Sequence, residues 1–157
     1  MIDTDTFTRE VLHAEKSLYY TAKTLLHNDE DCADAMQNAI LKAYEKLGTL
    51  KDEKYFRTWL TRILINECYS MLRRQHDTVP YEEYLAGQEQ TAAFRGENEI
   101  LEELGELPEK YRIPIVLHDI NGFSTAEIAG MLDISAAGVR MRLMRGRGML
   151  KKLIMDA

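Results

Sequence analysis

The chain has 157 residues, of which 45% are hydrophobic and 29% are charged, as in an ordinary soluble globular protein. This length fits one domain or two small ones. The longest apolar run, residues 113–117, is far below the roughly 20 residues of a membrane-spanning helix, and the acidic first residues are not those of a signal peptide. Cys32 and Cys68 form neither a disulfide framework nor a metal-binding spacing, so we expect a cytoplasmic protein without a metal site.

The formal net charge of −6 argues, as an average, against a nucleic-acid-binding protein, which is usually basic. The charge is unevenly distributed, however: residues 1–74 carry a net −1, residues 75–108 carry −8 and residues 109–157 carry +3. From residue 135 onward, the sequence contains six Lys or Arg residues and a single acidic residue, an Asp. This pattern indicates a basic functional surface near the C-terminal end, attached to an acidic segment. We also expect the weak overall charge to give the free chain poor affinity for DNA.

Apolar residues recur with helical spacing through the first half, and no stretch alternates as a strand would. We predict a first helix over residues 5–27. A second helix is predicted to begin after the capping segment 28–31 and to end at Gly48, and a third to cover residues 55–74. Trp59 falls in the apolar stripe of the third helix, which favours core packing over base stacking. The residues predicted to face inward from the second helix are Ala33, Met36, Ile40, Ala43 and Leu47.

Residues 76–98 lack sustained periodicity and are rich in glutamate, so we interpret them as a flexible acidic linker with a short helical piece at residues 81–85. In the following segment, Pro108 is predicted at the first position of a helix. Pro114 is predicted to make that helix irregular, and Asn121 with Gly122 to end it. The predicted fold class is all-α, with two small helical domains. The predicted boundaries are 1–75 for the first domain, 76–98 for the linker and 99–157 for the second domain.

The strongest local signal lies in residues 124–135. Ser124 and Glu127 have the spacing of a capping box, which predicts a helix start. Asp133 occupies a turn position that favours a left-handed backbone, and Ser135 is suited to cap a longer helix. A short helix, a three-residue turn and a second helix together give the spacing of a helix-turn-helix motif.

The helix after Ser135 is predicted to have two contrasting faces. Val139 and Leu143 fall on an apolar face with Gly146, and the opposite face is cationic. A major-groove recognition helix needs this combination, although a solvated amphipathic helix is the simpler alternative. The capped helix that precedes it favours DNA binding. Gly138 and Gly146 are each expected to weaken the helix by roughly 1 kcal/mol relative to alanine.

Six strings and a single asparagine carry a resemblance to a known family. In the first half they are DCADAMQNAILKAY at residues 31–44 and FRTWLTRI at residues 56–63, followed by Asn66 and LRR at residues 72–74. In the second half they are LPEKYR at residues 107–112, GFSTAEIA at residues 122–129 and VRMRLMRGR at residues 139–147. Over nearly its whole length the chain resembles an extracytoplasmic-function (ECF) sigma factor, the smallest class of bacterial RNA polymerase sigma subunits, with its regions 2 and 4.

The resemblance implies a function in transcription initiation, with no cofactor, no small-molecule substrate and no enzymatic activity. Region 2 of the family docks on the clamp helices of the largest subunit of core RNA polymerase. The residues that correspond to this contact are Asp34 and Gln37, i, i+3 neighbours on one helix. Region 2 also takes up a flipped base of the melted minus-ten element, which needs a pocket and a cationic path. The residues implied for minus-ten DNA are Lys51, Lys54, Phe56, Arg57, Arg62, Asn66, Arg73 and Arg74.

Region 4 of the family reads the minus-thirty-five element and lies near the polymerase flap. The residues implied for this contact are Ser135, Arg140, Met141, Met144, Arg145, Arg147 and Lys151, of which the last two add salt-sensitive attraction to phosphates. The family also implies control by an anti-sigma factor, often membrane-anchored, which would hold the protein at the membrane. The acidic linker would thread the polymerase active-site cleft, as an RNA mimic or as a simple soluble spacer.

Three other classes stay open at this point. A stand-alone helix-turn-helix transcriptional regulator accounts for the second half but leaves the first unexplained. An adaptor or anti-sigma protein would lack the cationic face. An enzyme is disfavoured because the histidines are scattered and the sequence has no glycine-rich phosphate loop and no nucleophile–base pair. His118, the histidine nearest to the helix-turn-helix, is expected in the core or at its rim.

Overall fold

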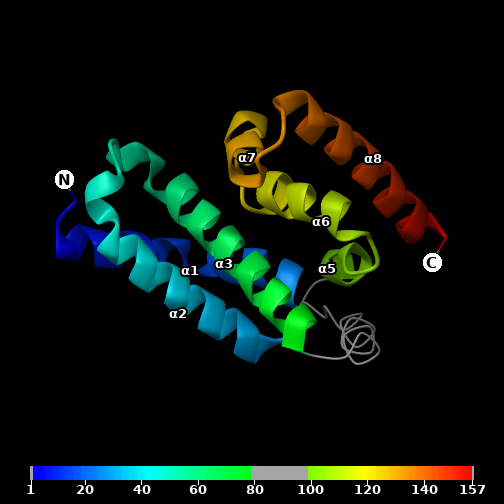
Figure 1. Cartoon of the computed structure of the whole chain (residues 1–157). Coiled ribbons are helices and arrows are strands. Elements are labelled where there is room, and N and C mark those ends of the chain that lie inside the picture. The colour runs from blue at the N-terminus through cyan, green and yellow to red at the C-terminus, as the bar shows by residue number, and fades with distance from the viewer. Residues whose placement is uncertain (1, 79–98, 157) are drawn as a thin grey trace.

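The computed structural model of the chain describes residues 2–78 and 99–156, and within these ranges the regular structure consists of helices without a strand. Figure 1 shows two groups of helices, α1–α3 and α5–α8. The predicted all-α fold class is therefore confirmed. The domain boundaries remain predictions, and the helical piece expected at residues 81–85 lies outside the described residues.

The first group has three long helices and two single 3-10 turns. They are α1 (Thr4–Leu26), α2 (Asp29–Glu45), η1 (Leu47–Thr49), η2 (Glu53–Tyr55) and α3 (Phe56–Thr78). Asn28 caps α2 as predicted, because its side chain accepts a hydrogen bond from the amide of Asp31. Gly48 was predicted to end α2 but lies in η1, where 3-10 hydrogen bonds turn the chain without a left-handed glycine. The third helix also continues beyond its predicted end at Arg74.

The buried face of α2 is rotated relative to the predicted one. Ala33 is exposed, and Met36 and Ile40 are only half-buried. The buried residues of this helix are Cys32, Ala35, Ala39 and Ala43. Because α2 packs against both α1 and α3, small side chains face inward and the larger apolar ones lie at the edge of the helix contact. The prediction rested on apolar spacing alone, which placed Ala43 and Leu47 correctly in the core but misplaced the other three residues.

The second group contains α5 (Glu99–Leu104), α6 (Glu109–Ile115), η4 (Val116–Ile120), α7 (Thr125–Leu132) and α8 (Ala136–Met155). Pro108 is the N-cap of α6 rather than its first residue. The irregularity predicted at Pro114 is present, since α6 widens into the π-helical turn η4 just after it. Asn121 ends this turn, and Gly122 follows with φ of 81°, as a left-handed terminator should.

The two groups share a continuous hydrophobic core. Helix α3 packs against α7, while α1 packs against α6 and η4. Leu18 and Leu60 from the first group and Leu117 and Ile128 from the second are among the most deeply buried side chains. Trp59 is half-buried against this core, in agreement with the packing role predicted for it. The packing brings the first turns of α3 next to the helix-turn-helix, and α8 lies on the outer side of the second group (Figure 1).

Candidate nucleic-acid interface

The predicted helix-turn-helix is formed by α7 and α8. Ser124 accepts from the amide of Glu127 at 3.1 Å, and the Glu127 carboxylate accepts from the amide of Ser124 at 3.0 Å, which completes the predicted capping box. Asp133 has φ of 57° in the turn, as predicted, and the Ser135 side chain caps α8 through the amide of Gly138. These local contacts start both helices and end α7 where the sequence indicates.

The outward face of α8 carries the cationic residues. Val139, Leu143 and Gly146 are buried against the second group. Met141 and Met144, although apolar, are 47% and 68% exposed. The exposed residues on and beside this face are Ser135, Arg140, Met141, Met144, Arg145, Arg147 and Lys151. The structure therefore brings the whole predicted minus-thirty-five set onto one accessible surface, in the arrangement that a major groove requires.

Arg147 differs from its neighbours because it already has an acidic partner. Its Nε and Nη2 atoms donate to the two carboxylate oxygens of Asp119 in η4, at 3.1 and 2.6 Å. His118, half-buried at the rim of the core, lies 2.8 Å from the same carboxylate through Nδ1. Partial burial alone would raise the pKa of Asp119, but the hydrogen bonds from Arg147 and His118 lower it below its usual value. Arg147 thus ties α8 to η4.

Gly146 is required for the helix crossing and does not simply weaken α8 as we expected. A Cβ atom at this position would lie 2.9 Å from Ile115 Cδ1 and 3.2 Å from both the Cβ and the carbonyl oxygen of Tyr111. The absence of a side chain lets α8 approach α6 closely. Gly146 therefore has a lower helix propensity than alanine, as predicted, but it permits a close helix contact that alanine would not.

Two members of the predicted minus-ten set, Asn66 and Arg73, line a groove between α2 and α3. The groove has a volume of about 270 Å³ and is also lined by Lys42 and Lys46 from α2. Its floor is the Glu67 carboxylate, which is 3% exposed and pairs with the Lys42 ammonium group. Burial alone would raise the pKa of Glu67, but the hydrogen bonds from Lys42 and Asn38 lower it.

The rest of the predicted minus-ten set is dispersed along α3 and the loop before it. Phe56 is 2% exposed and packs edge-on against Phe7, with ring centroids 5.6 Å apart, so its ring lies in the core and not at a pocket wall. Arg57 turns towards the second group of helices, where its guanidinium donates to the carbonyl oxygen of Asn121 at 2.7 Å. Arg57 is nevertheless exposed, as are the remaining members of the set, which are Lys51, Lys54, Arg62 and Arg74.

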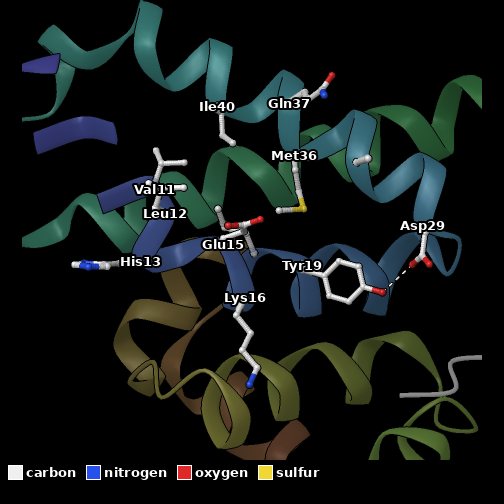
Figure 2. A pocket seen from close by; sticks show the side chains of 12 residues that line it. Val11, Leu12, His13, Glu15, Lys16, Tyr19, Asp29, Met36, Gln37 and Ile40 are labelled. Carbon is white, nitrogen blue, oxygen red and sulfur yellow. Dashed lines mark hydrogen bonds between the residues drawn. The ribbon is translucent and has the colours of Figure 1, made fainter. Parts of the chain in front are cut away.

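The predicted docking pair, Asp34 and Gln37, is exposed on α2. Gln37 borders a second cavity, of about 720 Å³, between α1 and α2. Figure 2 shows Val11 and Leu12 from α1 opposite Met36 and Ile40 from α2 in this cavity. A polar pair next to an apolar groove is a combination suited to a helical protein partner.

Sequence reasoning missed Lys42, Lys46 and Glu67. The i, i+4 spacing of the two lysines was visible and would have placed them on one face of α2. The pairing with Glu67 was not visible, because Lys42 and Glu67 lie on different helices and are 25 positions apart in the chain. In the described residues no helix has the length and hydropathy to cross a membrane, and no group of side chains has the make-up of a metal site.

Comparison with known proteins accounts for both halves of the chain. Residues 11–78 match the model of sigma-70 region 2, and residues 97–150 match the model of sigma-70 region 4. A stand-alone helix-turn-helix regulator is not favoured, because the region 2 match explains the half of the chain that such a regulator leaves unexplained.

Individual relatives belong to the same class. The chain is 31% identical over 141 residues to the ECF RNA polymerase sigma factor SigM of Mycobacterium tuberculosis, covering 88% of this chain and 72% of that protein. It is 28% identical over 171 residues to the ECF RNA polymerase sigma factor SigW of Bacillus subtilis, covering 98% and 91%.

Two solved structures have the same fold. The sigma factor RpoE of Bartonella quintana, in complex with the anti-sigma factor NepR, matches with a TM-score of 0.75 and 21% identity over 95% of this chain and 96% of that one. CnrH, in complex with the cytosolic domain of CnrY, matches with a TM-score of 0.72 and 25% identity over 98% and 90%. With both regions present along one chain, the protein belongs to the ECF sigma factors, the subunits that direct RNA polymerase to promoters and that are not enzymes.

Proposed function

We propose that residues 99–157 of this sigma factor bind the minus-thirty-five element through the outward face of α8. The observation that carries this proposal is the exposure of Arg140, Met141, Met144 and Arg145 on one face, above a buried apolar face. Arg140 and Arg145 are suited to base or phosphate contacts, and the two methionines to apolar contacts with base edges. Ser135, Arg147 and Lys151 extend this surface along the phosphate backbone.

We propose that residues 1–75 bind core RNA polymerase and minus-ten DNA through different surfaces. Asp34 and Gln37 dock on the clamp helices, and the neighbouring α1–α2 groove accepts apolar side chains of the same partner. On α3, Asn66 and Arg73, with Lys42 and Lys46 beside them, form a cationic path for single-stranded DNA. Lys51, Lys54, Arg57, Arg62 and Arg74 flank that path, and buried Phe56 supports the loop before it.

Control by an anti-sigma factor belongs to the same proposal. Of the two solved structures of similar fold, one is a sigma factor in complex with an anti-sigma factor, NepR, and the other is CnrH in complex with the cytosolic domain of CnrY. A partner that covers α2 and α8 would block polymerase and promoter together. We place the protein in the cytoplasm, where polymerase and promoter DNA are found, with membrane attachment only through such a partner. Residues 76–98 are the proposed linker.

The proposed surfaces are tested by transcription with purified core RNA polymerase on a promoter identified by genome-wide binding. Arg140→Ala combined with Arg145→Ala is expected to abolish initiation while leaving polymerase binding intact. Asp34→Ala combined with Gln37→Ala is expected to abolish polymerase binding. Arg9→Ala on α1 and Glu45→Ala on α2 change exposed charged residues outside both surfaces and serve as matched controls. Loss of polymerase binding in the α8 variant would contradict the division of functions.

A further inference from the structure

Exposed methionines gather on α8. The chain has eight methionines, and four of them lie within the 20 residues of this helix. The exposed fractions of their side chains are 47% for Met141, 68% for Met144, 40% for Met149 and 72% for Met155. In the rest of the described chain, methionine side chains are buried or half-buried. Since methionine is usually a core residue, core packing does not explain this concentration on one surface.

Two of the four methionines are placed among the cations proposed to contact DNA. Met141 and Met144 are i, i+3 neighbours on the outward face of α8, next to Arg140 and Arg145 in the sequence. Their thioether groups therefore belong to the surface proposed to meet base edges. The other two exposed methionines lie nearer the C-terminal end of the helix, outside the proposed DNA-binding set.

The two thiols of the chain are protected from oxidants. Cys32 and Cys68 are fully buried. Burial raises the pKa of Cys32 to about 12 and also raises that of Cys68. Both thiols are poor targets, because peroxides react with an accessible thiolate. Within the described residues, the sulfur-containing side chains that an oxidant reaches first are thus the methionines of α8.

Oxidation changes what a methionine can offer to DNA. Hydrogen peroxide transfers one oxygen atom to the sulfur: the O–O bond breaks, an S–O bond forms, the sulfur is oxidised and the peroxide is reduced to water. The resulting sulfoxide is polar and accepts hydrogen bonds but does not donate them. In the major groove, most base-edge groups are themselves acceptors or are thymine methyl groups. A sulfoxide on the reading face therefore loses the apolar contact and meets acceptors without a donor to offer.

We propose that Met141 and Met144 form a reversible oxidation site, at which hydrogen peroxide weakens binding of the minus-thirty-five element. This inference rests on the proposed DNA-binding function of α8. Methionine sulfoxide reductases, one for each epimer of the sulfoxide, restore the thioether. The site therefore couples promoter binding to the balance between peroxide and reductase activity.

The test compares oxidised and untreated chains within the polymerase holoenzyme. The full-length chain is treated with hydrogen peroxide, quenched, mixed with untreated core polymerase and purified as holoenzyme. This purification leaves out any chain in which oxidation of half-buried Met36 prevents docking. Peptide mass spectrometry is expected to show oxygen addition at the two proposed positions ahead of buried Met71 and Met131.

The expected effect on promoter binding is a weakening of about tenfold, comparable to one mismatched base pair. Binding is expected to recover when both reductases act on the oxidised chain before mixing. This recovery is measured on the wild-type chain, so it tests the site even where a substituted variant folds or binds poorly.

Leucine replacements supply the matched variants. Met141→Leu combined with Met144→Leu keeps apolar side chains of similar size but no sulfur, so its promoter binding is expected to resist peroxide. Met149→Leu combined with Met155→Leu removes the other exposed methionines of α8 and is the control. The control is expected to remain as sensitive to peroxide as the wild-type chain.

Several results would overturn the oxidation site. They are unchanged promoter binding with both sulfoxides present, oxidation of the buried methionines first, a loss that the reductases do not reverse, an equal loss in the first leucine variant, and resistance of the control. Untreated Arg140→Ala combined with Arg145→Ala tests the proposed function separately. Normal promoter binding by that variant would contradict the DNA surface, whereas the peroxide results decide the oxidation site.

Discussion

Arg57 at the start of α3 and Asn121 at the end of η4 are joined by a hydrogen bond of 2.7 Å from the guanidinium to the backbone carbonyl. The two residues are 64 positions apart in the chain. The bond brings the beginning of the proposed minus-ten surface to the entrance of the helix-turn-helix. As a result, local changes in α7 are expected to affect more than the helix that contains them.

Glu127 has two structural functions, so replacing it should destabilise the protein more than removing an ordinary helix cap does. It accepts from the Ser124 amide in the capping box and from the Thr58 hydroxyl of α3. Ser124→Ala removes only the cap and is expected to lower the free energy of unfolding by about 1 kcal/mol. Glu127→Ala removes both contacts, and we expect a loss of about 2 kcal/mol. Urea denaturation measures both values, and equal losses would mean that the Thr58 contact adds nothing to stability.

Two glycines of α8 should respond in opposite directions to alanine. Gly146→Ala is expected to lower the free energy of unfolding by about 1–2 kcal/mol, because the new Cβ meets Ile115 and Tyr111. Gly148→Ala should raise it by about 0.5–1 kcal/mol, since this position is exposed and has no atom within 4 Å of the added Cβ. Thermal or urea unfolding of the two variants is the measurement. A gain in both would show that α8 shifts easily away from α6.

The stability of the protein should fall in mild acid because of His27. Burial, with the nearby charges of Arg112 and Lys23, lowers the pKa of His27 to about 4 from 6.5. Between these two values His27 is protonated in the unfolded chain but neutral in the folded protein. The free energy of unfolding therefore decreases as the pH falls from 6.5 to 4. The expected decrease from pH 7.5 to 4.5 is about 2–3 kcal/mol.

The matched variant for this effect is His27→Asn, because asparagine tolerates the left-handed backbone at this position, where φ is 70°. Urea denaturation of both proteins across the pH range isolates the histidine, since all other groups are shared. The wild-type protein should lose more stability than the variant between pH 6.5 and 4. Parallel curves would show that His27 takes up its proton in the folded state.

Arg140 and Arg147 should differ in how strongly they make DNA binding depend on salt. Arg140 is exposed, whereas Arg147 already forms a two-point ion pair with Asp119. Replacing a cation that contacts a phosphate should reduce the slope of log K against log salt by about 1. We expect that change for Arg140→Ala and a smaller one for Arg147→Ala. The measurement is promoter binding by the polymerase holoenzyme at several salt concentrations, and equal changes would mean that Arg147 leaves Asp119 on binding.

Much of the second half of the chain could be predicted because its signals are local. Ser124, Glu127, Asp133 and Ser135 act on backbone groups within a few residues of themselves, so the sequence alone indicates both helices and the turn of the helix-turn-helix. The same holds for the cationic face of α8, since one helical period separates residues that share a face. Gly146 is the exception, because its importance depends on Tyr111 and Ile115 of another helix.

The first half shows the limit of the same reasoning. Apolar spacing identified the helices, but α2 has two neighbours, and only the three-helix packing decides that its alanines are buried and that Met36 borders a groove. The partners of Glu67 are set in the same way, by helices that meet after folding.

The sequence by itself determined the helices, the N-terminal caps of α2, α7 and α8, the helix-turn-helix and the family, because all of these depend on spacing along the chain. The tertiary structure alone decided which partners the predicted DNA-binding residues have within the folded chain. Arg57 is turned towards Asn121, Phe56 is in the core, and Arg147 is paired with Asp119. The reason is physical: a side chain takes the partner that folding brings nearest, and that partner can lie anywhere in the sequence.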